Sequence, residues 1–469
     1  MAAIDRKIFI REYSEAMRNG SAAMFVGAGV SKAAGYVDWK GLLKEIAEDL
    51  GLDVERESDL ITLAQFHLNE RKGRDKLNQI LVDEFLETHE PTRAHKLIAS
   101  LPLGTIWTTN YDDLLEKAFE LAGKRVDVKR HKDDINFTRR RTDVTIYKMH
   151  GDKTAIAEAV LAKDDYETYH PKRELFSIAL KGDLTQKTFL FIGVSFTDPN
   201  LAYILNRVRQ LVDAQGRKHF CLLRQPRPED YKGAGYDVQR FKHFLVDLER
   251  YNIKPVLLDS YNEIPEILNE LNRRSHLRDV LISGSAADFM PLGEEKLRAI
   301  CRELGRVLVK EDFNVISGFG HGIGGDVITG ALQSLPRNDD QRLKLWPFPQ
   351  EIPDIQDRAA FWTEYRKRMI AEAGICVVIS GNKRADDRID RAQGVREEAR
   401  LTLAEGKIVL PIGATGHVAR ELWDEVSEDL PKFFGSADVA KPFAILGDET
   451  APVDELVKAV TEILKALNK

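Results

Sequence analysis

The sequence has 469 residues, 43% hydrophobic and 31% charged, a composition typical of soluble globular proteins. It excludes a disordered, collagen-like or coiled-coil chain, and the length predicts two or three domains at ~150 residues each. The 69 Lys and Arg residues oppose 75 Asp and Glu residues, so the net charge of −6 predicts no broad electrostatic binding of nucleic acid or a membrane.

Three widely separated cysteines, Cys221, Cys301 and Cys376, argue against a disulfide framework and indicate a reducing compartment. The N-terminal segment is charged and lacks the apolar core of a signal peptide. The most apolar stretch, Thr188 to Phe196, has about half the length of a membrane span. We therefore expect a cytoplasmic protein without membrane partners.

Short β-branched or aromatic runs alternate with amphipathic stretches, which predicts an α/β fold of two Rossmann-like domains with mostly parallel sheets. The apolar face of Ile8, Phe9 and Tyr13 predicts an opening helix that ends at Gly20. A strand over 22–26 follows, and then a helical insertion that extends to about Ser100. The other strands predicted in the first half cover residues 104–108, 144–149, 188–193, 220–223 and 255–258, with helices such as 112–122 and 200–214 between them.

The alternation restarts after a basic, polar stretch at residues 272–278. We place the boundary there, with domains 1–276 and 277–469. The elements predicted in the second half are strands 280–285, 314–318, 375–380 and 407–412 and a helix over 294–308. The prolines between Arg337 and Asp357 predict a surface loop or insertion.

Glycine or polar residues follow four of the strands predicted in the first half. Gly27-Ala28-Gly29 follows the first strand, where a Gly-x-Gly turn either brings the backbone close to a diphosphate or serves as a tight structural turn. The polar residues at the other three strand ends are Asn110, Asp112, His150, Ser195, Asp198 and Asn200. Open α/β sheets bind ligands at this edge, although helix capping or strand-end packing also explains each residue singly.

The motifs GAGVS, TNYD and HG and the GVS/DPN element, in this order, resemble the NAD-binding motifs of sirtuin-like domains over residues 10–270. The resemblance implies that Gly27, Ala28, Gly29 and Ser31 bind the NAD diphosphate and ribose. It implies that Asn110 and Asp112 hold the nicotinamide ribose and the carboxamide, and that His150 is the catalytic histidine. Gly193 and Ser195 match the contact with the adenosine side.

Two departures from sirtuin deacylases change the expected reaction. The zinc-binding cysteine pairs are absent, and YVDWKGLL stands in place of the aromatic–Arg element. We therefore expect water to attack the ribose and release ADP-ribose and nicotinamide, with Asn110 orienting the ribose or the water and His150 as general base. No metal is expected, because the sequence has no HExxH motif or clustered ligand set.

The second half has two glycine-rich turns, in VLISGS and NVISGFGHGIGGDVI, which suit a phosphate or a sharp turn. This half resembles the SLOG superfamily, whose members bind nucleotide-derived ligands. Relatives that cleave nucleotides carry PGGxGTxxE, and GIGGDVITG here lacks its threonine and glutamate. We therefore expect a ligand sensor.

A sirtuin-like domain followed by a SLOG domain resembles the effectors of Thoeris antiphage defence. The resemblance implies that a cyclic ADP-ribose isomer, made by a TIR-domain partner, binds the second domain and activates NAD+ hydrolysis, and that the protein is a homotetramer that can assemble further. The implied ligand-binding residues are Arg366, Lys383 and Glu398, with backbone contacts from Gly284, Ser285, Gly413, Ala414 and Thr415. A protein deacylase or ADP-ribosyltransferase, a non-catalytic nucleotide sensor, and an NADase triggered by a phage protein are the alternatives.

Overall fold

The structure is a computed structural model that describes residues 3–212, 216–227, 236–337, 339–348, 357–385 and 388–468. The chain divides into two compact α/β units, Met1–Asn272 and Arg273–Lys469. Neither unit contains, in its described part, a helix long and apolar enough to cross a membrane.

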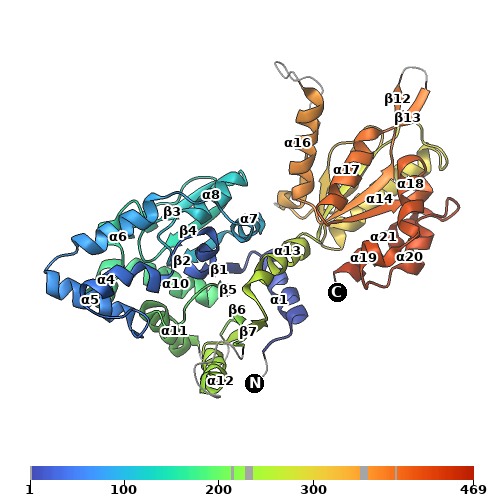
Figure 1. Ribbon diagram of the computed structural model, residues 1–469. Helices are drawn as coiled ribbons and strands as arrows, with labels where there is room; N and C mark the ends of the chain where they lie inside the picture. Colours follow the sequence, from blue (N-terminus) through green and yellow to red (C-terminus); the bar gives the residue numbers. More distant parts are fainter. Residues whose placement is uncertain are drawn as a thin grey trace. The chain divides into compact units, whose positions relative to one another are not determined.

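The first unit is built on a parallel sheet of seven strands in the order β3-β4-β2-β1-β5-β6-β7 (Figure 1). The strands are β1 Ala22–Val26, β2 Thr105–Thr108, β3 Val126–Lys129, β4 Val144–Lys148, β5 Thr188–Ile192, β6 His219–Arg224 and β7 Ile253–Leu258. The strand order runs in opposite directions on the two sides of β1. Because all strands are parallel, their carboxyl ends meet at one edge, and the crevice beside β1 is where such sheets bind ligands.

Helices cover both faces of this sheet. They are α1 Arg6–Arg18, α2 Ala28–Ser31, α3 Trp39–Leu42, α4 Lys44–Asp49, α5 Leu60–Arg71, α6 Asp75–Leu86, α7 Arg93–Ser100, α8 Leu114–Leu121, α9 Lys163–Glu167, α10 Tyr169–Gln186, α11 Pro199–Val212, α12 Tyr236–Glu249 and α13 Ile264–Ser275. Successive side chains of β1 alternate between two cores: Met24 packs with α1, α7, α8 and α13, and Phe25 with α10, α11 and α12. The helical insertion after the first strand is confirmed as α2 to α7.

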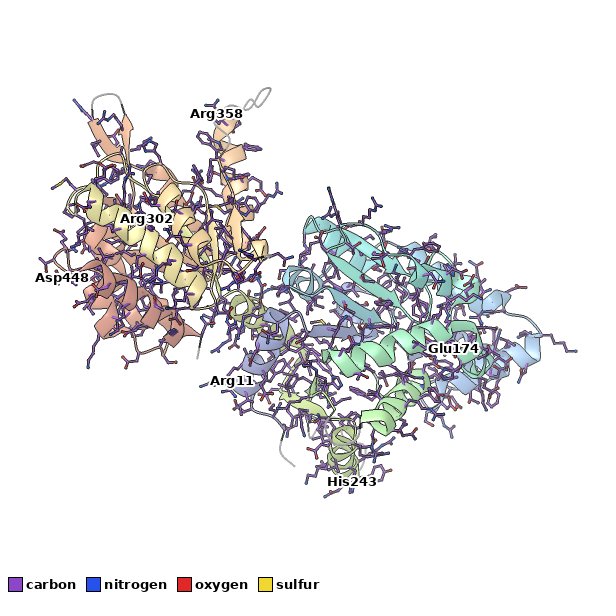
Figure 2. The ribbon with its side chains drawn as sticks, turned by 180° about the vertical axis from the view of Figure 1, so that it is seen from behind. Arg11, Glu174, His243, Arg302, Arg358 and Asp448 are labelled. Atoms are coloured by element: carbon purple, nitrogen blue, oxygen red, sulfur yellow. The ribbon has the colours of Figure 1, made fainter. Side chains whose placement is uncertain are left out.

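The second unit has a parallel sheet of five strands in the order β10-β9-β8-β11-β14 and a separate antiparallel hairpin, β12-β13. The strands are β8 Asp279–Ser285, β9 Asn314–Ser317, β10 Leu343–Leu345, β11 Ile375–Ser380, β12 Asn382–Ala385, β13 Arg388–Arg391 and β14 Ile408–Ile412. The helices are α14 Glu294–Lys310, α15 Gly324–Ser334, α16 Arg358–Ala371, α17 Gln393–Ala404, α18 His417–Ser427, α19 Leu430–Phe434, α20 Ala440–Ile445 and α21 Val453–Leu467. Charged side chains such as Glu174 on α10 and Arg302 on α14 project from the helices that cover the two sheets (Figure 2).

Two expectations about individual elements are wrong. Ile8 is 40% exposed and does not belong to the buried face of α1. The predicted loop from Arg337 to Asp357 contains β10, which pairs with β9 at the edge of the second sheet. Strand β3 and the hairpin strands β12 and β13 were not predicted. Within the predicted loop, residues 349–356 lie outside the described part of the chain.

Candidate active site and ligand pocket

The glycines after β1 allow two chain segments to approach each other closely. The amide of Gly29 donates to the carbonyl oxygen of Gly193 at 3.1 Å, directly beyond β5. A Cβ atom on Gly27 would lie 2.2 Å from the same oxygen, and Gly193 itself has φ +66°. The GAGVS turn is therefore required for packing between the ends of β1 and β5, whatever else it binds.

Asn110 follows the end of β2, and only one of the two polar atoms of its side-chain amide has a hydrogen-bond partner within the described residues. Its Nδ2 donates to Oγ of Ser31 at 2.9 Å, which joins the β2 and β1 ends. The side chain is buried, and its Oδ1 has no hydrogen-bond partner within the described residues. An unpartnered buried amide oxygen costs free energy, so it points to an absent donor. A ribose hydroxyl or a water molecule has the right chemistry.

Asp112 and Ser195 both make local hydrogen bonds. Oδ1 of Asp112 accepts from the amide of Leu114 at 3.0 Å, so the carboxylate closes a local turn before α8, whose N-cap residue is Asp113. Ser195 is exposed, and its Oγ is 2.6 Å from Oγ1 of Thr197. A local backbone contact therefore accounts for Oδ1 of Asp112. Nothing in these contacts assigns a ligand to Ser195.

His150 follows β4 and is completely enclosed. Its imidazole is 1% exposed, with the rings of Tyr166 and Tyr169 edge-on at 5.5 and 6.2 Å. Burial lowers the pKa of His150 below its usual 6.5; the carboxylate of Asp198 opposes that shift and the guanidinium of Arg173 adds to it. The imidazole is thus neutral at pH 7, as a general base must be.

Asp198 and Asn200, in the DPN sequence after β5, contact His150. Oδ2 of Asp198 and Nδ2 of Asn200 each lie 3.5 Å from Nε2 of the histidine. The other oxygen of Asp198 accepts from the amide of Leu201 and caps α11. Sequence analysis placed both residues at this edge of the sheet, but it did not assign them a contact with the histidine. The segments after β4 and β5 therefore meet across the ends of β2 and β1, which lie between these strands in the sheet.

A cavity of about 40 Å³ adjoins Asn110. The predicted residues Ala28, Ser31 and Asp112 line it with Asn110, and its other walls include Tyr36, Val37, Asp38, Trp39, Leu42 and Phe85. His150, Gly193 and Ser195 do not line it. Ligand cavities generally measure ~300–1,000 Å³, so this one is too small to hold a whole dinucleotide.

The second unit contains a larger cavity, of about 560 Å³. We call it the Arg366 cavity. Five of the eight predicted ligand residues line it: Gly284, Ser285, Arg366, Lys383 and Glu398. Gly284 and Ser285 come from the end of β8, Arg366 from α16, Lys383 from β12 and Glu398 from α17.

Arg366 and the buried Glu398 form an ion pair at this cavity, with the arginine partly exposed. Nε of Arg366 lies 3.3 Å from Oε1 of Glu398, and its Nη1 lies 3.1 Å from Oε2 of Glu397. Oγ of Ser283 donates to the other oxygen of Glu398 at 2.5 Å. Burial raises the pKa of Glu398, against the hydrogen bond from Ser283 and the charge of Arg366. Both acidic residues thus face the arginine.

The other three predicted ligand residues do not line this cavity. Gly413, Ala414 and Thr415 are buried, and their polar groups are engaged elsewhere. The amide of Ala414 donates to Leu446 O at 2.7 Å, and Oγ1 of Thr415 accepts from the amide of Ser380 at 2.8 Å. These residues stabilise the end of β14 against α20 and β11.

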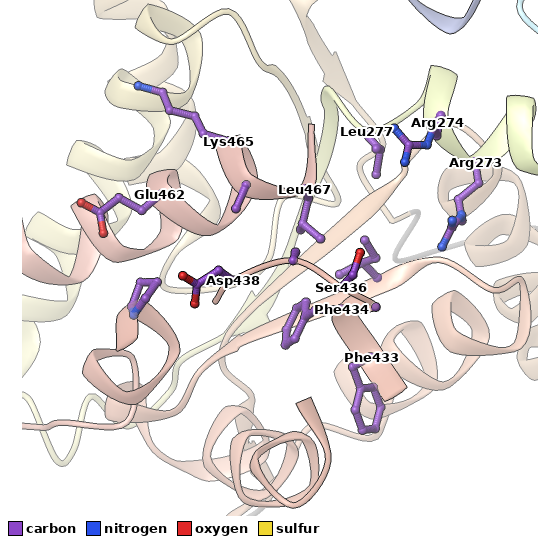
Figure 3. Close-up of a pocket in the computed structure, with 15 residues that line it drawn as sticks. Arg273, Arg274, Leu277, Phe433, Phe434, Ser436, Asp438, Glu462, Lys465 and Leu467 are labelled. Atoms are coloured by element: carbon purple, nitrogen blue, oxygen red, sulfur yellow. The ribbon is translucent and has the colours of Figure 1, made fainter. Parts of the chain in front are cut away.

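A third cavity, of about 800 Å³, contains none of the predicted residues (Figure 3). Phe433, Phe434, Asp438 and Lys465 are among its walls. No group of three or more His, Cys, Asp and Glu side chains that could hold a metal ion occurs in the described ranges.

Residues 104–255 match the SIR2-like domain family, and residues 263–467 match the Sir2- and TIR-associating SLOG family. The chain is 40% identical over 472 residues to NAD(+) hydrolase ThsA of Bacillus cereus (strain MSX-D12), with 98% of each chain covered. It is 38% identical to NAD(+) hydrolase ThsA of Acinetobacter baumannii (strain 532279), again over 98% of both chains. Defense-associated sirtuin 2 of Bacillus subtilis is 32% identical over 47% of this chain and 22% of its own length.

Proposed function

The chain belongs to the ThsA family of NAD(+) hydrolases of Thoeris defence, and we propose that its first unit cleaves NAD+ into nicotinamide and ADP-ribose with water as nucleophile. The single observation that carries this proposal is the buried Oδ1 of Asn110, which has no partner among the described residues and adjoins a cavity at the end of β2. A ribose hydroxyl or the attacking water would supply the missing donor.

The chemistry requires little from the protein beyond orientation and one base. The bond between C1′ of the ribose and the nicotinamide nitrogen breaks, and its electron pair neutralises the positive ring, so the leaving group needs no proton. Water attacks C1′ and gives a proton to the neutral imidazole of His150. Burial lowers the pKa of His150, which keeps the base unprotonated, and Asp198 opposes that shift and favours the imidazolium that forms.

Two features support hydrolysis over protein deacylation. The three cysteines are free and buried at separate places, so they build no zinc-stabilised cleft for an acyl-lysine. The cavity beside Asn110 is also walled by Tyr36 and Trp39, which belong to the YVDWKGLL segment that stands in place of the aromatic–Arg element of sirtuin deacylases. Without a site for an acyl-lysine, water is the available nucleophile.

The second unit would act as the sensor. We propose that a cyclic ADP-ribose isomer from a TIR-domain enzyme binds the Arg366 cavity, where Arg366 and Lys383 offer positive charge to the diphosphate and Glu398 accepts from a ribose hydroxyl. The ligand activates only through a higher affinity for the active state. We further propose a cytoplasmic homotetramer formed through the sirtuin-like domains.

The test is NAD+ consumption by the purified full-length chain, with nicotinamide and ADP-ribose quantified by chromatography. The protein is assayed alone and with a panel of cyclic ADP-ribose isomers, beside Asn110→Ala and Arg366→Ala. We expect one isomer to activate cleavage, Asn110→Ala to abolish it, and Arg366→Ala to raise the activator concentration required. Intact NAD+ under every condition would refute hydrolysis, and full activity without any isomer would refute the sensor.

A further inference from the structure

Lys148, the last residue of β4, carries a fully buried ammonium group beside both candidate catalytic loops. We infer that Lys148 is a positioning residue, which fixes the loop of residues 109–113, bearing Asn110, against the loop of residues 149–153, bearing His150. This inference rests on the proposed function. It concerns a residue with no contact to substrate in the proposed mechanism.

The ammonium group binds the first loop through its backbone. Nζ donates to the carbonyl oxygen of Tyr111 at 3.3 Å and to that of Asp112, on the two residues that follow Asn110. It also donates to Oε1 of Glu116, in the first turn of α8, at 3.0 Å. A cation bonded to consecutive carbonyl groups fixes the backbone direction there, and therefore the direction of the neighbouring Asn110 side chain.

The same ammonium group binds the second loop through a carboxylate. Its Nζ lies 2.6 Å from Oδ2 of Asp152, two residues after His150. Nε of Arg130 lies 3.2 Å from the same oxygen, and Oδ1 of Asp152 accepts from the amide and hydroxyl of Thr154 at 2.9 and 2.7 Å. Burial would raise the pKa of Asp152, but the charge and hydrogen bond of Lys148, with Thr154, lower it to about 2.

Lys153 adds two connections between the loops. Its amide donates to the carbonyl oxygen of Tyr111 at 3.0 Å, and its Nζ lies 2.8 Å from Oδ2 of Asp113. The carbonyl of Tyr111 thus accepts from both Lys148 and Lys153. The two loops are joined at backbone and side-chain level, with Lys148 at the centre.

The burial of this lysine has a clear physical cost. An ammonium group in the interior loses its hydration, and only well-placed partners compensate for that loss. The cluster contains two cations and two carboxylates. Lys148 and Arg130 each pair with both Glu116 and Asp152. An apolar strand end would avoid the cost altogether, so the geometry points to a role in holding the loops.

The experiment compares Lys148→Met with Lys148→Met/Glu116→Gln in the full-length chain. The double variant removes one carboxylate with the cation and preserves the charge balance of the cluster, yet it still lacks the donor to the two carbonyl groups. Lys407→Met is the matched control, because Nζ of Lys407 is also buried and donates to carbonyl oxygens, those of Ile370 and Ala371 at 2.7 and 3.1 Å, in the second unit.

We expect kcat for NAD+ to fall about 100-fold in both Lys148 variants with KM little changed, because misplaced catalytic groups slow the chemical step more than they weaken binding. Amide hydrogen exchange of residues 109–113 and 149–153 should accelerate, whereas exchange in β1 and β5 stays as in the parent. Lys407→Met should lower the melting temperature without changing exchange in those loops.

Two outcomes would overturn the inference. Recovery of kcat in the double variant would mean that Lys148 only neutralises Glu116. Unchanged hydrogen exchange of both loops in Lys148→Met would mean that the ammonium group does not hold them, and this readout is valid even for a protein without NAD+ cleavage. Inactivity of the parent chain under every condition would instead refute the proposed function.

Discussion

Oδ2 of Asp198 lies 3.5 Å from Nε2 of His150, although the two residues follow different strands with two others between them. The hydroxyl of Tyr166 donates to the same carboxylate oxygen at 3.3 Å. The pair therefore combines an enclosed imidazole with a carboxylate that is itself oriented by a phenol and by its role as cap of α11. Such an arrangement holds the ring and stabilises the imidazolium once it has taken a proton.

The first prediction concerns pH. Burial lowers the pKa of His150 below 6.5, with Arg173 adding to the shift and Asp198 opposing it. We therefore expect kcat/KM to rise with pH to a plateau, with the midpoint of the rise below pH 6.5. Asp198→Asn removes the opposing charge, and the pKa falls further. The acidic limb of the pH profile should therefore move to lower pH. Asparagine also caps helices, so the fold is preserved; an unmoved limb would exclude Asp198 as the partner of the base.

The second prediction concerns Asn110. Asn110→Ala should lower kcat about 100-fold or more, because the group that orients the ribose or the water is lost. The melting temperature should change little, since the variant gives up one hydrogen bond, to Ser31, and one unpartnered buried oxygen. Calorimetry and initial rates check this together. A large fall in melting temperature would show that the amide serves the fold instead.

The third prediction concerns the glycine contact between β1 and β5. The new Cβ in Gly27→Ala would lie 2.2 Å from Gly193 O and 2.7 Å from Cα of Val194, so the strand ends must separate. We expect about 1–3 kcal/mol of destabilisation in denaturant unfolding, with loss of activity. Gly182→Ala is the control: nothing lies within 4 Å of its Cβ, and alanine should stabilise α10 by about 0.5–1 kcal/mol.

The fourth prediction separates sensing from catalysis. Arg366→Ala removes charged hydrogen bonds to the ligand and should raise the half-maximal activator concentration about 10- to 100-fold, with the maximal rate unchanged. Lys367→Ala is the control on the same helix, because Lys367 is 51% exposed and pairs only with Glu364 among the contacts of the described residues. Its activator response should match that of the parent chain.

The positions of the site residues were more predictable than their contacts. Parallel strands place the residues after them at one edge, and by this rule the sequence placed Asn110, His150 and Gly193 at the edge where β2, β4 and β5 end. The pairing of His150 with Asp198, 48 residues later, arises from the paths of the segments after β4 and β5, which cross the ends of the two strands between them. No periodic pattern in the sequence predicts that pairing or the contacts of Lys148 with the backbone.

In the strands that were not predicted, the alternation of buried apolar and exposed polar residues is either inverted or absent. In β3 the buried residues are Asp127 and Lys129, whose side chains pair at 2.8 Å, while the valines are only half-buried. The hairpin of β12 and β13 is mostly polar and mostly exposed. Hydrophobic alternation identifies neither case. For Gly413–Thr415 the resemblance implied backbone contacts with a ligand, and the packing around these residues, which the sequence does not reveal, engages the amide of Ala414 and the hydroxyl of Thr415 within the fold.

The small cavity beside Asn110 bears on the survival of the host cell. Tyr36, Trp39 and Phe85 line a cavity of only about 40 Å³ beside the amide. If this wall restricts NAD+ binding in the resting enzyme, NAD+ cleavage stays low in uninfected cells without a separate inhibitor. Trimming that wall, as in Trp39→Ala, should then produce a toxin: uninfected cells expressing the variant would lose NAD+ and stop growing, and adding Asn110→Ala would restore their growth.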